Sequence, residues 1–388
     1  MSKFIGTVYI ESCGVVSPAG YGIESCSRQA LNEASSIQYN EEGVLFGLLS
    51  GRASGVIGAL AVELSDMAFL RNHLLGLAAS RLAYEEALQP AFSQAKVIWS
   101  SAFGELAYHE NQVAEFLENS KSSLANVASP FAYSIASLIA SELRSSELSL
   151  ELRASMTGGA QVLLSAVEYM SLGGQRVLVG GSDSFVTPYA SKWFESKGLK
   201  TKQPSALFPH RPYGGKVEFS VGEGAAAAIL TRAPSDSGVR ITGIRVHSLD
   251  WSSGVTQEEQ LINKSKLCKE LLEEFFSDIG IDESNIDLVI TNGAGIPKED
   301  QLELNVLTSV FSPTMPFRCY TWQNGLMMAA NFFYHLGMAC QILKTGEVGG
   351  SPCIEHANFQ ADLRSKRMQR ILIVQIDTEQ VSAIVLEN

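Results

Sequence analysis

The strongest constraint on the fold is a strand–turn–helix–strand pattern in the middle of the chain. Residues 148–154, LSLELRA, alternate apolar and polar side chains as a half-buried strand does. Residues 155–159, SMTGG, form a sharp turn, and residues 160–172 then repeat apolar side chains at helical spacing. Residues 177–179 form a short buried strand that ends at two glycines. Two strands joined by a helix in this way predict a βαβ unit of an α/β fold.

Similar patterns recur after a Pro-Ser-Asp-Ser-Gly run at residues 234–238, which is a plausible boundary. The first part begins with a strand at 6–18 and closes with one at 225–230. For the second part we predict helices at 257–280 and 325–344 and strands at 287–291, 371–376 and 381–386. Two halves of similar order, 1–238 and 239–388, predict an internally duplicated, layered α/β fold.

Composition and charge exclude several classes of protein. The net charge is -12, from 29 Lys and Arg against 41 Asp and Glu, which disfavours nucleic acid as a partner. The start of the chain does not resemble a signal peptide, and no apolar stretch approaches the ~18–20 residues that span a bilayer. The six cysteines form no CxxC or CxxH pair. We therefore expect a cytoplasmic protein without disulfides or membrane insertion.

No cofactor or metal is expected from the sequence. The six histidines are scattered without HxxxH or HExxH spacing, and there is no P-loop and no GxGxxG between a strand and a helix. The turn at 155–159 remains the most informative chemical feature, because backbone N–H groups at a helix N-terminus favour developing negative charge. Its apex is Met156, which cannot act as an acyl nucleophile, so a purely structural crossover is the alternative interpretation.

Six short motifs, spread over nearly the whole chain, together resemble the β-ketoacyl synthase family of the thiolase superfamily. They are Gly14-Val-Val-Ser-Pro-Ala-Gly20, Ser129-Pro-Phe131, Leu150-Glu-Leu-Arg-Ala-Ser-Met156, Arg211-Pro-Tyr213, Val221-Gly-Glu-Gly-Ala225 and Asn292-Gly-Ala-Gly-Ile-Pro297. The resemblance implies a thiolase-like, duplicated α-β-α-β-α fold. It also implies a catalytic cysteine and two histidines, which active members use for acyl transfer and decarboxylation.

This chain departs from the family pattern at each of those catalytic positions. Met156 stands at the cysteine position, and Asn292 replaces the first histidine. The best alignment of the second histidine motif puts Gly325 at the histidine and Tyr320 at the family's lysine. Loss of the nucleophile alone costs about a millionfold in a well-studied triad. The departures therefore imply that the chain does not condense acyl groups by itself.

The resemblance extends to the chain-length factors of type II polyketide synthases, which are inactive homologues paired with an active ketosynthase. It implies a heterodimer in polyketide, polyene (including aryl polyene) or fatty acid biosynthesis. Acyl carrier proteins are acidic, so we expect docking mainly through the partner, although lysines 192, 197, 200 and 202 form a local basic run. Chain-length factors often carry glutamine at the cysteine position, and Met156 lacks its donor and acceptor.

The family also suggests which residues meet the partner and line its acyl tunnel. Phe131, Tyr133 and Ile135 follow the Ser-Pro motif that begins the family's interface segment. Ala132 stands where many active members have a second aromatic residue that reaches the partner's tunnel. Phe103 stands at the floor of the chain's own pocket and is a candidate plug. A plain repacking of the core explains Ala132 and Phe103 equally well.

Two other functions remain open from the residues alone. One is a stand-alone acyltransferase or hydrolase with a relocated nucleophile such as Ser155, although a strand points that side chain away from the side of Met156. The other is a module that binds an acyl chain or carrier protein without any ketosynthase partner.

Overall fold

The structure, a computed structural model, describes most of the 388 residues. It leaves out residues 1, 40–44, 66–69, 88–94, 105–109, 111–112, 116, 118–133, 155, 185–186, 200–206, 234–237, 250–256 and 364–365. Ser155, Phe131, Ala132 and Tyr133 therefore lie outside the described residues.

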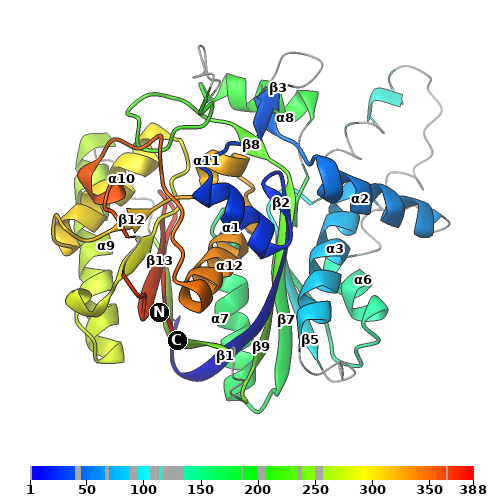
Figure 1. The fold of residues 1–388 in the computed structure, drawn as a ribbon, viewed down its shortest axis with the longest axis horizontal. Coiled ribbons are helices and arrows are strands. Elements are labelled where there is room, and N and C mark those ends of the chain that lie inside the picture. Colours follow the sequence, from blue (N-terminus) through cyan, green and yellow to red (C-terminus); the bar gives the residue numbers. More distant parts are fainter. Residues whose placement is uncertain are drawn as a thin grey trace.

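A mixed sheet of eleven strands runs through the described part of the molecule (Figure 1). At its centre β1 (Ser2–Ser17) lies antiparallel between β9 (Gly224–Thr231) and β10 (Val239–Ser248). Beyond β9 follow β7 (Arg176–Asp183), β5 (Lys96–Ser101) and β6 (Leu150–Arg153). Beyond β10 follow β14 (Gln380–Glu387), β13 (Arg370–Ile376), β11 (Leu288–Ile290) and β12 (Phe317–Arg318). The short β2 (Gly20–Tyr21) pairs with β1.

The strands on the two sides of the β1–β10 pair follow the same order. In the first half β1 is antiparallel to β9 and β9 to β7, whereas β7 is parallel to β5 and β5 to β6. In the second half β10 is antiparallel to β14 and β14 to β13, whereas β13 is parallel to β11 and β11 to β12. This repeat confirms the predicted duplicated fold of two similar halves, while the boundary at residue 238 stays a prediction.

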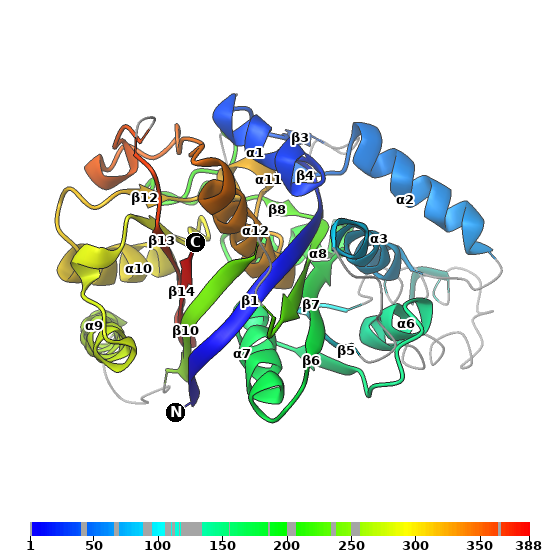
Figure 2. The same ribbon diagram turned by 60° about the horizontal axis from the view of Figure 1, so that its bottom comes forward.

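Helices separate and cover the sheet in layers (Figure 2). The two central helices are α7 (Gly158–Ser171) and α12 (Ala329–Thr345). One outer layer contains α3 (Arg71–Glu86) and α6 (Ile135–Glu142), and the other contains α9 (Gln257–Ile279) and α10 (Pro297–Val310). The result is the expected α-β-α-β-α arrangement.

The remaining elements lie around this frame. They are α1 (Ile23–Leu31), α2 (Gly51–Glu63), α8 (Pro188–Ser196), α11 (Thr321–Asn324), β3 (Ile37–Tyr39), β4 (Leu45–Gly47), β8 (Val221–Gly222) and the short 3-10 turns Glu283–Asn285 and Ala357–Phe359.

The close contact between α7 and α12 explains the small residues at the start of α7. A Cβ atom added at Gly159 would lie 2.5 Å from the Cβ of Phe332 on α12. The first twelve residues of α12 are all buried, as expected of a helix that is apolar around its whole circumference. Because α7 and α12 pack against each other and against the sheet, their N-termini lie next to both halves of the chain.

The predicted helix at 325–344 begins four residues late, at Ala329. Gly325 has a φ of 74° and Met328 has a φ of 47°, and neither conformation continues a right-handed helix. Met328 is thus a non-glycine residue in a conformation that favours glycine. The sequence pattern could not show this, because Leu326, Met327 and Met328 have the composition of a buried helix.

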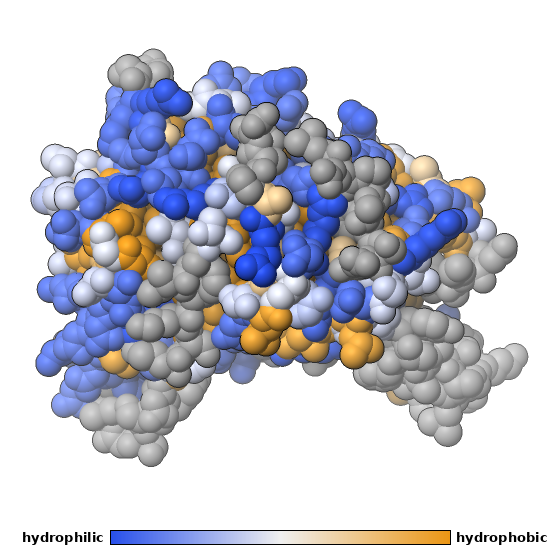
Figure 3. Space-filling model, turned by 90° about the horizontal axis from the view of Figure 1, so that it is seen from below, coloured by the Kyte–Doolittle hydropathy of each residue, from blue (hydrophilic) through white to orange (hydrophobic). Residues whose placement is uncertain are grey.

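The surface and the cysteines agree with the composition. Hydrophilic residues cover most of the lower face of the molecule, with hydrophobic residues in smaller patches between them (Figure 3). None of the helices in the described residues is both long and apolar enough to cross a membrane. All six cysteines are buried and unpaired by disulfides.

Candidate functional site

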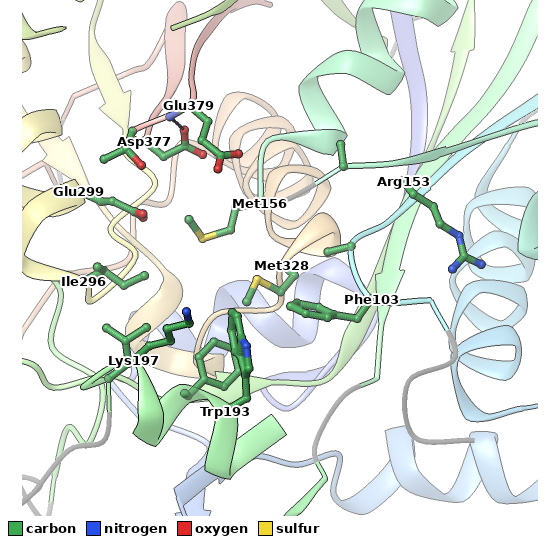
Figure 4. A pocket seen from close by; sticks show the side chains of 15 residues that line it. Phe103, Arg153, Met156, Trp193, Lys197, Ile296, Glu299, Met328, Asp377 and Glu379 are labelled. Carbon is green, nitrogen blue, oxygen red and sulfur yellow. Dashed lines mark hydrogen bonds between the residues drawn. The ribbon is translucent and has the colours of Figure 1, made fainter. Parts of the chain in front are cut away.

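A cavity of about 630 Å³ lies at the N-terminus of α7 (Figure 4). Its walls come from the turn before α7, the loop after β5, helix α8, the residues that lead into α10 and α12, and the turn between β13 and β14. The cavity therefore collects residues from both halves of the chain at the end of the central helix. It is lined by Met156 and Phe103, two of the residues predicted to mark the site.

Met156 occupies the apex of the turn before α7, as predicted. Its side chain is 8% exposed and belongs to a cluster of buried apolar residues with Phe194, Leu326 and Met328. In Figure 4 the thioethers of Met156 and Met328 both point into the cavity. The turn before α7 therefore presents a thioether to the cavity, and a thioether cannot attack an acyl group as a cysteine thiolate does.

A buried carboxylate fixes the wall that contains Phe103 and Met328. Asp183, at the end of β7, accepts hydrogen bonds from the backbone N–H groups of Ala102 (3.0 Å), Phe103 (3.1 Å) and Ala329 (2.9 Å) and from the hydroxyl of Ser101 (3.0 Å). Burial raises the pKa of Asp183 to about 6, although these donors favour its ionised form. One side chain thereby joins the loop after β5 to the first residue of α12.

Phe103 lies on the cavity wall beside Trp193 of α8, with ring centroids 6.1 Å apart in a T-shaped contact. The cavity of about 630 Å³ remains open next to it. The role of Phe103 as a plug therefore stays a prediction.

Asn292 follows β11 and is 1% exposed. Its Oδ1 atom accepts hydrogen bonds from Asn331 Nδ2 (3.1 Å) and Gln375 Nε2 (3.2 Å). Its backbone N–H and that of Gly293 donate to Glu303 of α10 at 3.0 Å each. Asn292 is thus held by the side-chain amides of Asn331 and Gln375. Its carboxamide cannot take part in acid–base chemistry as an imidazole can.

Gly325 and Tyr320 are not among the residues that line the cavity. A Cβ atom at Gly325 would lie 2.9 Å from the carbonyl oxygen of Ser220, so a histidine there would collide with the backbone before β8. Tyr320 is fully buried and belongs to the main core.

His335 is the histidine on α12 and lies in the core. Burial alone lowers its pKa to about 3, and both of its ring nitrogens are buried without hydrogen-bond partners.

Ile135, a predicted interface residue, is 2% exposed and lies at the first position of α6. Its Cγ2 atom approaches Gly76 of α3 so closely that a Cβ atom there would be 2.8 Å away. Its backbone N–H donates to Glu151 of β6 at 2.8 Å. Ile135 therefore packs within its own chain, and a part in the partner interface stays a prediction.

The sequence analysis did not identify the acidic wall of the cavity. Glu299 of α10 and Asp377 and Glu379 of the β13–β14 turn line it together (Figure 4). Asp377 and Glu379 lie in a turn of only three residues between two apolar strands, and such a turn is usually exposed to solvent. The acidic start of α10 gave no signal either, because acidic residues are common in the first turn of any helix.

Burial raises the pKa of Glu299 to about 8, with smaller contributions from the negative charges of Asp377, Asp300, Glu379 and Glu303. Burial likewise raises the pKa of Asp377 to about 6 and of Asp300 and Glu303 to about 7. Protons are therefore retained on this acidic group at pH values where exposed carboxyl groups have lost them.

Comparisons of sequence find no matching family model and no similar curated protein. Solved structures do match. A type II polyketide acyl-carrier protein in complex with its ketosynthase bound to the hexaketide, AntDE:AntF, matches with TM-score 0.81 and 16% identity, covering 99% of this chain and 100% of that chain. The ishigamide ketosynthase/chain length factor matches with TM-score 0.78 and 16% identity, with coverage of 99% and 100%.

A third match is the ketosynthase ApeO in complex with its chain length factor ApeC from Xenorhabdus doucetiae, with TM-score 0.76, 14% identity and coverage of 98% and 97%. These likenesses extend over the whole chain and show that it has the thiolase-like ketosynthase fold. The predicted fold class is thereby confirmed.

The acidic wall makes stability depend on pH in a definite direction. An acid whose pKa is higher in the folded state than in the unfolded state stabilises the fold while it is protonated, and this contribution is lost as pH rises through the folded pKa. The contribution of Glu299 is present in full below its unfolded pKa of about 4.5 and is lost as pH rises to its folded pKa of about 8, so the free energy of unfolding should fall between about pH 5 and 8 and level off above that. The buried histidines His210 and His335 act in the opposite direction, but only at lower pH, because their pKa values are lowered to about 4 and 3.

Glu299→Gln should flatten this fall, by up to about 1.4 kcal/mol per pH unit for the one proton removed. Urea unfolding at pH 6.5, 7 and 8 measures the slope, pH 9 gives the plateau, and Glu355→Gln, at a side chain that is 91% exposed, is the matched control. Equal slopes for wild type and Glu299→Gln would contradict the raised pKa.

Proposed function

We propose that this chain is the non-catalytic, chain-length-factor-like subunit of a heterodimer with an active β-ketoacyl-carrier-protein synthase. The observation that supports this most directly is the cavity at the N-terminus of α7, which is lined by Met156 from the turn before the helix. No cysteine or histidine is among the residues that line this cavity in the described part of the chain. The complex would act in type II polyketide or fatty acid biosynthesis, with aryl polyenes as the favoured products and the cytoplasm as the place of action.

The edge of the sheet at β6 supports a partner subunit. β6 is the last strand on its side, and no strand of the described residues pairs with its outer edge. Leu150 is 40% exposed on β6, and Leu148 just before it is 84% exposed. An open edge with exposed leucines favours pairing with another chain. We infer that the ketosynthase partner covers this edge.

The carrier protein would dock mainly on the partner. Lys192 on α8 and Lys197 just after it are exposed, but Lys197 borders a cavity that also contains three acidic side chains. An acidic carrier protein with a phosphate-bearing arm gains little from such a mixed surface. Lys200 and Lys202 lie outside the described residues.

The first test is chemical inertness. Cerulenin, which alkylates the active-site cysteine of ketosynthases, should label the partner subunit and leave this chain unlabelled, because Met156 offers no thiolate. Intact-mass spectrometry of the purified complex measures both subunits in one experiment, so the partner is the internal control. Stoichiometric labelling of this chain at residues 155–159 would contradict the proposal and favour a relocated nucleophile such as Ser155.

The second test is assembly through β6. The double variant Leu148→Lys, Leu150→Lys places two charges at the open edge and should weaken association with the ketosynthase by about tenfold or more. Ile262→Lys on α9 is the control, because Ile262 is 61% exposed and lies on the opposite outer layer (Figure 2). Co-purification from cells that express both subunits, followed by sedimentation, measures the effect. Equal recovery of both variants would exclude β6 as the interface.

The third test concerns chain length. We infer that the segment with Ala132 lines the partner's acyl tunnel, and an aromatic side chain would remove roughly 150–250 Å² of free surface there. Ala132→Phe should shorten the longest product by several carbons while early condensations continue, whereas Phe103→Ala should change it little. Mass spectrometry of carrier-bound products measures this. A normally assembled Ala132→Phe complex with unchanged products would exclude Ala132 from the tunnel.

A further inference from the structure

The cavity beside Met156 has two chemically different walls (Figure 4). One wall is apolar and aromatic, with Phe103, Trp193 and Met156. The other carries the carboxyl groups of Glu299, Asp377 and Glu379. A packing defect in the core would be apolar on all sides, whereas this cavity has one apolar wall and one wall of carboxyl groups.

The carboxyl groups differ in the hydrogen bonds that the protein donates to them. Asp377 accepts hydrogen bonds from the backbone N–H groups of Glu379 and Gln380, both at 2.7 Å, so its own turn satisfies it. Glu299 differs, because its Oε2 atom is buried and has no hydrogen-bond partner. In Figure 4 the carboxyl group of Glu299 points toward the same space as those of Asp377 and Glu379. A buried, unpaired carboxylate oxygen is costly unless a donor reaches it.

The nearby cations do not supply that donor. Arg153 lies 3.6 Å from Glu151 on its own strand and points away from the acidic wall in Figure 4. Lys197 lies over the Trp193 ring, with Nζ 5.8 Å from the ring centroid. Lys264 approaches from α9 and donates to the carbonyl oxygen of Thr378. Glu299 Oε2 thus has no hydrogen-bond donor, and the acidic wall gains negative charge as its carboxyl groups lose their protons.

We propose that this cavity binds an amphipathic organic cation, a primary ammonium carried on an aromatic or alkyl body. The ammonium group would donate to Glu299 and lie among the three carboxyl groups, and the apolar body would rest against Trp193, Phe103 and Met156. A volume of about 630 Å³ is within the range of small-molecule sites. Once its carboxyl groups are ionised, the same wall would repel anionic acyl groups and phosphates. The site does not depend on the proposed heterodimer, because every residue in it belongs to this chain.

Three probes of nearly equal shape test the charge requirement. They are 2-phenylethylammonium, 2-phenylethanol and 3-phenylpropionate, titrated calorimetrically into the full chain, co-expressed with its partner where the chain requires one. At pH 9 the carboxyl groups are largely ionised while a primary amine is still largely protonated. The ammonium should bind about tenfold or more tightly than the alcohol, and the carboxylate should show no binding. Equal binding of ammonium and alcohol, or tighter binding of the carboxylate, would overturn the proposal.

Two variants locate the site. Glu299→Gln should weaken ammonium binding about tenfold and leave the alcohol unchanged, whereas the exposed Glu355→Gln should change neither. Trp193→Ala, at a side chain 39% exposed and so replaceable without loss of the fold, should weaken both probes alike. In a complex, these differences assign binding to this chain, because the partner is identical in every sample. Ammonium binding that survives both variants would place the ligand elsewhere and refute the assignment.

Discussion

The carboxylate of Asp183 is the interaction on which the arrangement of the site depends. It stands at the end of β7 and binds the backbone on both sides, at Ala102 and Phe103 after β5 and at Ala329, the first residue of α12. Its position at a helix N-terminus also suits a negative charge. One buried side chain therefore sets the distance between the two halves at the point where they enclose the cavity. This role of Asp183 is one of geometry and needs no chemistry at the site.

The residues around the cavity offer neither a nucleophile nor a general base at the three positions that the sequence analysis singled out. The turn before α7 and the cavity beside it are present, and Gly159 lets α12 approach the start of α7. Met156 presents a thioether, and Asn292 presents a carboxamide that is held by Asn331 and Gln375. Gly325 has no space for a side chain, because the backbone before β8 lies too close.

Much of the fold could be predicted from the sequence because its signals are local. The alternation in residues 148–154 gave β6, and the apolar periodicity at 257–280 gave α9, with the boundaries shifted by a few residues. The conformations of Gly325 and Met328 could not be predicted, because they depend on contacts with β8 and on Asp183. The inward packing of Ile135 and the meeting of Glu299 with Asp377 also depend on tertiary contacts between segments far apart in sequence. The turn at Met156 and the helix after it could be predicted because a turn and a helix start are properties of a few adjacent residues.

The two edge strands of the large sheet differ in how accessible they are to pairing with another chain. The edge at β6 is open among the described residues, whereas the opposite edge is the two-residue β12, and both of its residues are buried. Arg318 of β12 donates to the carbonyl oxygens of Gly349, Phe359 and Ala361, so a loop closes that side. A sheet that can be extended at only one end adds one neighbour and then stops, whereas two open ends would permit a filament. An assembly that used only the β6 edge of the sheet would therefore be a pair.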